Sequence, residues 1–152
     1  MKTKMIVILF AAFVLVACTA DSGDKTGTGT PGPACTTCEP DRTAGEAAAT
    51  PSAGMVATHE LTMQFAKPES PYPDGTKGTF VIGADNTLKV TINGVCTLIK
   101  NPVVRAASSV EFIFKDNCSK NVEYQASATP SGTLNEINIG PVGGGYFGQF
   151  HQ

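Results

Sequence analysis

Apolar and polar residues alternate along most of the chain after residue 54, which is the period of β-strands. The clearest example is MVATHELTMQF, residues 55–65. One face of this segment carries Ala57, His59, Leu61, Met63 and Phe65, and the other carries Thr58, Glu60, Thr62 and Gln64. Only His59 interrupts the apolar face, so the segment is predicted to be a strand with one buried side.

The same alternation predicts further short strands, separated by turn signals. Asn93-Gly94 predicts a type I′ hairpin, because both central residues of that turn need positive φ, and residues 84–86 predict another turn. The further strands are expected at residues 78–82, 86–92, 95–99, 110–114, 121–127, 133–139 and 146–150. The pattern predicts an all-β fold, a small antiparallel sandwich or barrel of about seven or eight strands, and leaves both architectures open.

Two polar connections are candidate binding loops, because loops on a rigid sheet commonly carry recognition. Residues 67–77 contain three prolines, which exclude a ladder-forming strand, and Tyr72 is expected at the tip of this loop. Residues 101–109 form the second connection and contain Arg105. Tyr72 and Arg105 are therefore predicted binding residues.

Gly143, Gly145 and Gly148 have the G-x-G-x-x-G spacing of dinucleotide-binding loops. That motif requires a strand before it and a helix after it, and no helical pattern follows here. The glycines are therefore predicted to form a bend that leads into a last strand. Tyr146 and Phe147 are expected to pack in the core or to form an exposed contact surface.

The first residues read as a targeting segment. Residues 1–17 combine Lys2 and Lys4 with an apolar core too short to cross about 30 Å of hydrocarbon as a helix. The sequence LVAC at residues 15–18 resembles the lipobox of bacterial lipoproteins. The resemblance implies cleavage before Cys18, a diacylglyceryl group on its thiol and acylation of the new amine, for example with palmitate.

Such acyl chains would anchor the protein to a membrane in the cell envelope. Thr19 rather than Asp after the cysteine implies sorting to the outer membrane in a cell that has one. The alternative is an ordinary secretory signal that happens to end near a cysteine.

Amino-acid composition divides the rest of the chain into a predicted tether and a predicted β-domain. Residues 18–54 are rich in Gly, Pro, Thr and Ala, and we expect a flexible tether with a root-mean-square span of roughly 30 Å. The predicted organisation is a signal peptide at 1–17, a lipidated Cys18 and tether at 18–54, and a β-domain at 55–152. Cleavage would leave nine basic and thirteen acidic residues, a net charge of −4, which disfavours nucleic acid as a partner.

The four remaining cysteines form an even set, as in exported proteins with disulfides. We favour a Cys96–Cys118 disulfide, since both residues are expected at strand ends, with Cys35 and Cys38 paired to each other or free. Cys35 and Cys38 have the C-x-x-C spacing of a redox centre or half a zinc site. Their flanking prolines predict no helix to activate a thiol, and His59 and His151 are not spaced as further ligands.

No catalytic, metal-binding or cofactor-binding constellation is predicted. His59 is expected to be a half-buried packing residue with a local hydrogen bond. The carboxylates Glu111, Asp116, Glu123 and Glu136 are expected on solvated faces.

The sequence therefore favours a non-enzymatic, membrane-anchored envelope lipoprotein whose β-domain binds an unidentified protein or small molecule, or has a structural role. One alternative is an inhibitor of a lysozyme or protease, by analogy with small all-β lipoproteins. A second alternative is a thiol redox protein that uses Cys35 and Cys38.

Overall fold

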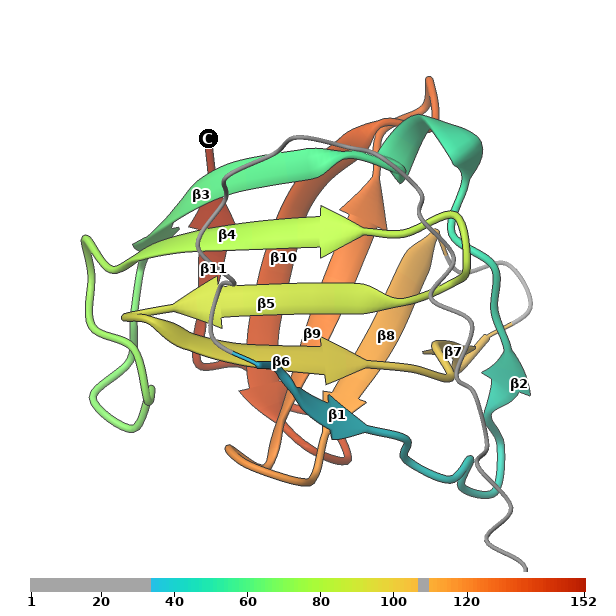
Figure 1. Ribbon diagram of the computed structural model, residues 1–152, viewed down its shortest axis with the longest axis horizontal. Coiled ribbons are helices and arrows are strands. Elements are labelled where there is room, and N and C mark those ends of the chain that lie inside the picture. Colours follow the sequence, from blue (N-terminus) through green and yellow to red (C-terminus); the bar gives the residue numbers. More distant parts are fainter. Residues whose placement is uncertain (1–33, 107–109) are drawn as a thin grey trace, which may run out of the picture. The chain divides into compact units, whose positions relative to one another are not determined.

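The computed structural model describes residues 34–106 and 110–152. The predicted signal peptide, Cys18 and the first part of the predicted tether lie outside the described residues, as do residues 107–109 of the second candidate loop. The all-β prediction is confirmed, and the described residues form eleven strands and no α-helix (Figure 1).

Eight of the strands match the predicted ones to within a few residues. The strands are β1 (Thr36–Cys38), β2 (Ala47–Ala48), β3 (Thr58–Gln64), β4 (Lys77–Ile82), β5 (Leu88–Ile92), β6 (Val95–Ile99), β7 (Val103–Val104), β8 (Glu111–Asp116), β9 (Val122–Ala128), β10 (Leu134–Pro141) and β11 (Gly148–His151). A 3-10 helix, η1 (Ala53–Met55), precedes β3.

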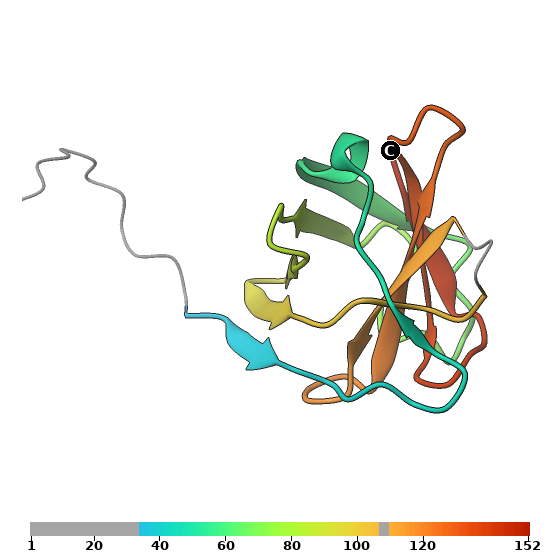
Figure 2. The same cartoon turned by 90° about the vertical axis from the view of Figure 1, so that its right-hand side faces the viewer.

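All eleven strands belong to one strongly curled sheet, a half-barrel, in the order β1-β6-β5-β4-β3-β11-β10-β9-β8-β7-β2 (Figure 1, Figure 2). A sandwich of two sheets is therefore wrong. The sheet is also mixed rather than antiparallel, because β1 pairs with β6 in parallel. The other pairs are antiparallel, as expected for strands joined by short turns.

The two edges of the sheet come from consecutive parts of the chain. β1 forms one edge and β2 the other, and residues 39–46 connect them. The sheet curls so far that β6 and β8 lie close to each other, although they are not paired. We call this junction of β6 and β8, together with residues 34–49, the seam.

Part of the predicted tether belongs to the sheet. Residues 36–38 and 47–48, expected in the tether, are strands of the sheet, and the described residues belong to one compact unit, Pro31–Gln152. Composition failed here because the ordering of these residues comes from disulfides and ion pairs rather than from apolar burial.

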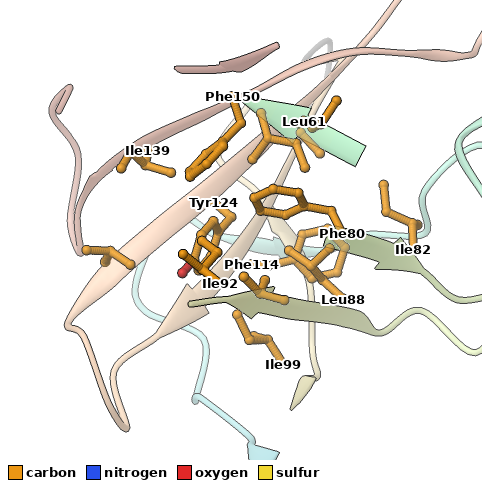
Figure 3. Close-up of a cluster of buried hydrophobic side chains, with 14 of the residues drawn as sticks. Leu61, Phe80, Ile82, Leu88, Ile92, Ile99, Phe114, Tyr124, Ile139 and Phe150 are labelled. Carbon is orange, nitrogen blue, oxygen red and sulfur yellow. The ribbon is translucent and has the colours of Figure 1, made fainter. Parts of the chain in front are cut away.

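Apolar side chains of both halves of the sheet fill the interior of the half-barrel (Figure 3). The rings of Phe80 and Phe150 meet at 4.8 Å between centroids, and Tyr124 meets Phe80 edge-on at 6.1 Å. Burial of each such side chain stabilises the fold by about 1.5–3 kcal/mol. Leu61 and Met63, predicted on the buried face of β3, lie in this core.

The predicted turns are present. Asn93 and Gly94 have φ values of 51° and 77° between β5 and β6, as a type I′ hairpin requires. Asn86 has a φ of 62° in the turn between β4 and β5. Gly143, Gly144 and Gly145 all have positive φ between β10 and β11, which confirms the predicted bend.

Phe65 departs from the alternation that predicted it to be buried. β3 ends at Gln64, and Phe65 has a φ of 55° and is 68% exposed. The change of backbone conformation turns this ring away from the face shared by Leu61 and Met63. His59 is half-buried and its Nε2–H donates to the Met55 carbonyl at 2.9 Å, as predicted.

Candidate functional site

Two disulfides fasten the seam. Cys35 is bonded to Cys96, with 4.5 Å between Cα atoms, and Cys38 is bonded to Cys118, with 5.7 Å. All four predicted cysteines are therefore bonded, but the favoured Cys96–Cys118 pairing is wrong. Sequence spacing could not reveal the pairing, because it depends on where β1 inserts in the sheet.

The position of β1 explains the pairing. Thr36 lies opposite Thr97 in the parallel register, so the preceding Cys35 lies beside Cys96 of β6. Cys38 is three residues further along the strand and therefore points to the opposite face. There it reaches Cys118 in the turn after β8. The C-x-x-C segment joins the two sides of the seam rather than forming a local disulfide.

Charged side chains connect the same elements, and three of the four are buried. Arg105 donates two parallel hydrogen bonds to Glu123, at 2.7 and 2.6 Å, and lies 3.6 Å from Glu46. Lys115 of β8 donates to Glu46 at 2.7 Å and to the Asp41 carbonyl at 2.7 Å. The two carboxylates and two cations balance in charge. The Lys115–Glu46 pair ties β8 to residues 41–46, and the Arg105–Glu123 pair ties the β7–β8 connection to β9.

The surroundings keep both carboxylates ionised. Burial would raise the pKa of Glu46, but hydrogen bonds from Lys115 and Thr43 outweigh it and lower the pKa to about 2. Burial likewise opposes ionisation of Glu123, and hydrogen bonds from Arg105, Gln125 and the Gly143 amide lower its pKa below the ordinary value. Neither group is poised to exchange a proton near neutral pH.

The expectation of solvated carboxylates is therefore wrong for two of the four residues. Glu123 and Asp116 are fully buried. Asp116 accepts from the Ser119 amide at 2.9 Å and from its hydroxyl at 2.6 Å. Sequence spacing gave no sign of these partners, since the Arg105–Glu123 pair depends on the strand order.

An open polar groove of about 540 Å³ lies beside the seam. We call it the seam groove. Three parts of the chain line it: the β1–β2 connection together with the end of β2, the β4–β5 turn, and the β6–β7 connection. Its lining residues are Pro40, Asp41, Arg42, Ala48, Ala49, Asp85, Asn86, Thr87, Lys100, Asn101 and Pro102.

Some polar side chains of the groove have hydrogen-bond or ion-pair partners, and Arg42 has none among the described residues. Lys100 forms an ion pair with Glu39 at 2.5 Å, and Asp85 accepts from the Thr87 hydroxyl at 2.8 Å. The exposed Arg42 guanidinium has no ion-pair or hydrogen-bond partner among the described residues. Because a guanidinium offers five donors in a planar fork, Arg42 can bind a carboxylate or phosphate.

A smaller hollow of about 110 Å³ lies at the opposite end of the half-barrel, between the residue 67–77 loop and the β5–β6 turn. Tyr72 and Tyr124 line it and their hydroxyls are 3.1 Å apart. Burial raises the pKa of both phenols. Tyr72 is only 7% exposed, so the expectation that it projects from the loop tip is wrong. Its ring packs edge-on against Phe150.

The structure scatters the other predicted binding residues. Arg105 belongs to the ion network of the seam. Tyr146 and Phe147 are half-buried beside the start of the residue 67–77 loop, where the Lys67 ammonium lies 5.4 Å from the Tyr146 ring centroid. The Lys67 amide donates to the Phe147 carbonyl at 2.7 Å. The topology brings these two predicted contact regions together because β3 and β11 are neighbours.

The groove residue Arg42 was missed because it lies in the predicted tether. An isolated Arg in a Gly- and Ala-rich stretch carried no signal beyond charge. Among residues 34–106 and 110–152, no three His, Cys, Asp or Glu side chains come together as a metal site would require.

No helix in the part of the chain that the structure describes is long and apolar enough to cross a membrane.

Comparison with known proteins supplies no relative: no family model matches the chain, and no curated protein or solved structure is significantly similar to it.

Proposed function

We propose that this protein is an exported lipoprotein, anchored at Cys18, whose β-domain binds a ligand in the seam groove. The observation that carries the binding role is the unpartnered Arg42 guanidinium in an open polar hollow of about 540 Å³. The ligand class is a polar molecule or peptide segment with a carboxylate or phosphate that Arg42 contacts.

The framework around the groove favours binding without large rearrangement. The lining segment of residues 40–42 lies between Cys38, which is bonded to Cys118, and Glu46, which is paired with Lys115. A segment fixed at both ends loses less conformational entropy when a ligand binds. The seam groove is therefore suited to recognition by a preformed surface.

The disulfides support export and a structural role for the cysteines. Disulfides persist mainly in oxidising compartments outside the cytosol. A C-x-x-C redox centre cycles between a local dithiol and a local disulfide. Here Cys35 and Cys38 have different and distant partners, so the redox alternative has no local pair to use.

Intact-mass analysis of the protein from its native envelope tests the anchor. We expect a mature chain that begins at Cys18 and carries a diacylglyceryl group and an N-linked acyl chain, in the outer membrane if the cell has one. A retained leader, or an unmodified Cys18, contradicts the proposal.

Site-specific photo-crosslinking tests the groove. A photoreactive residue at Ala49, which lines the groove, should capture a ligand from the native envelope, whereas the same residue at Lys89 on an exposed face of β5 should not. Arg42→Ala should reduce capture about ten-fold, because it removes a charge-assisted contact, and Arg42→Lys should reduce it less. Equal capture from both positions contradicts the groove as the site. Capture of a lysozyme or protease would favour the inhibitor alternative.

A further inference from the structure

One end of the half-barrel is where the chain enters the sheet. β1 is parallel to β6, so both strands begin at the same end, and β6 begins directly after the Asn93-Gly94 turn. The antiparallel pairing places the end of β3, the start of β11 and the β8–β9 turn at that end as well. We call it the proximal end, because residue 34 enters the domain there.

The chain length between Cys18 and the domain is short. Residues 19–33 separate the two, and this segment spans at most about 55 Å when fully extended. A tether that reached to residue 54 could span more than twice that distance, about 125 Å. An anchor at Cys18 therefore keeps the point where the chain enters the domain within about 55 Å of the bilayer.

Phe65 is the most exposed large apolar side chain of the described residues, and it lies at this end. Its φ of 55° is rare for a bulky residue and is strained. The surrounding hydrogen bonds enforce this backbone: the next amide, of Ala66, donates to Asp74 at 2.7 Å, and the Lys67 amide donates to the Phe147 carbonyl. The structure thus holds an aromatic ring outward rather than leaving it in a loose loop.

Other features of the proximal end suit a lipid surface. Val95, after the β5–β6 turn, is 57% exposed. Lys67, Lys77 and Lys120 are exposed there, and none forms an ion pair with a described residue. The exposed carboxylates at this end are Glu69 and Asp74.

The described residues of this end therefore carry a slight excess of positive charge, although residues 34–152 contain eleven acidic and eight basic residues. Exposed lysines around an apolar side chain match the anionic headgroups and acyl boundary of a bilayer.

We propose that the proximal end is a second membrane contact, in which Phe65 inserts at the acyl boundary and the three lysines face anionic headgroups. The inference rests on the proposed anchor at Cys18. The anchor raises the local concentration of the domain at the bilayer, and one aromatic side chain and three lysines need this to bind the membrane. The contact directs the opposite end of the domain, which carries the start of β3 and the end of β4, away from the bilayer.

The absence of tryptophan from the chain allows a direct test. Phe65→Trp places a single fluorescent reporter at the proximal end, and Val56→Trp places a matched reporter before β3, at the opposite end, where Val56 is 37% exposed. The chain from residue 18 onward is coupled through the Cys18 thiol to maleimide lipids in vesicles that contain phosphatidylglycerol and brominated phosphatidylcholine. The other four cysteines are in disulfides, so Cys18 is the one thiol that couples.

On these vesicles we expect F65W emission to shift to shorter wavelength and to lose about half its intensity to the bromine atoms, with V56W unchanged. Vesicles without phosphatidylglycerol should reduce the F65W effect. Equal quenching of the two reporters, or none for F65W, overturns the proposal. Chemical coupling makes the F65W result independent of native lipidation. If Cys18 of the native protein is unmodified but F65W of the coupled protein is quenched, the proposed anchor is refuted and the proposed membrane contact is still supported.

Discussion

At the scale of single residues, matched partners hold every buried charge of the seam. The Glu123 carboxylate accepts from Arg105, from Gln125 at 2.7 Å and from the Gly143 amide at 3.2 Å. In the described part of the chain, no buried side-chain nitrogen or oxygen lacks a hydrogen bond. Such a network stabilises the seam only while it is complete, because removal of one member leaves the others desolvated and unpaired.

Glu123→Ala should therefore destabilise the protein by about 3 kcal/mol, because Arg105 and Gln125 lose their acceptor. Glu69→Ala, at an exposed carboxylate, should change the free energy of unfolding by less than about 0.5 kcal/mol. Urea denaturation of the two variants measures both effects. Similar stabilities for the two variants would show that the network contributes little.

The pH dependence of stability tests Glu46. Its pKa in the folded protein is about 2, below the ordinary value of 4.5. A carboxylate with a lowered pKa stabilises the fold above its unfolded pKa, and this contribution is lost as the pH falls from about 5 to 2. We expect the wild type to lose about 3 kcal/mol more than Glu46→Gln over that range. Parallel pH profiles for the two proteins would contradict the assignment.

The environment of a single residue could be predicted from the sequence where the groups it contacts lie nearby in the chain. The half-burial of His59 and the conformations of Asn93 and Gly94 follow from neighbours in the chain, and they were predicted correctly. Tyr72 was expected to be exposed because prolines surround it, but its hydroxyl meets Tyr124 from a distant strand. A contact of that kind leaves no trace in local composition.

At the scale of elements, strand length decided what could be predicted. The strands with five or more residues show alternation and were found. Three strands have only two or three residues, which is too short to show an alternation of apolar and polar positions: β1, β2 and β7. The sequence pattern placed β1 and β2 in the tether and β7 in a candidate binding loop. These three short strands form or adjoin the edges of the sheet, so missing them concealed both the seam and the groove.

Removal of a disulfide should destabilise the domain more than the Glu123 substitution. The two bonds close sequence separations of 61 and 80 residues. The chain-entropy model gives about 4 kcal/mol for each loop of this length. The double variants Cys35→Ser/Cys96→Ser and Cys38→Ser/Cys118→Ser should each show that loss in urea denaturation under oxidising conditions. Wild-type stability in either double variant would contradict a role for that bond in fastening the seam.

At the scale of the whole molecule, one short segment, residues 34–49, contributes both to the fold and to the proposed binding site. Residues 34–49 supply both edge strands, two of the four bonded cysteines, the Glu46 carboxylate and the Arg42 side of the seam groove. The same segment sets where the chain enters the domain, and hence which end we propose to face a membrane. A segment that composition assigned to a tether thus contributes to the sheet edges, the disulfides and the proposed binding site.

Disulfide mapping of the unreduced protein tests whether residues 34–49 are fastened to β6 and to the turn after β8. Trypsin releases residues 26–42 with both Cys35 and Cys38, residues 90–100 with Cys96, and residues 116–120 with Cys118. We expect one species in which all three peptides are joined, and fragmentation between Thr36 and Thr37 should assign Cys35 to Cys96 and Cys38 to Cys118. Residues 26–42 released alone with an internal disulfide, and residues 90–100 linked to residues 116–120, would contradict this pairing.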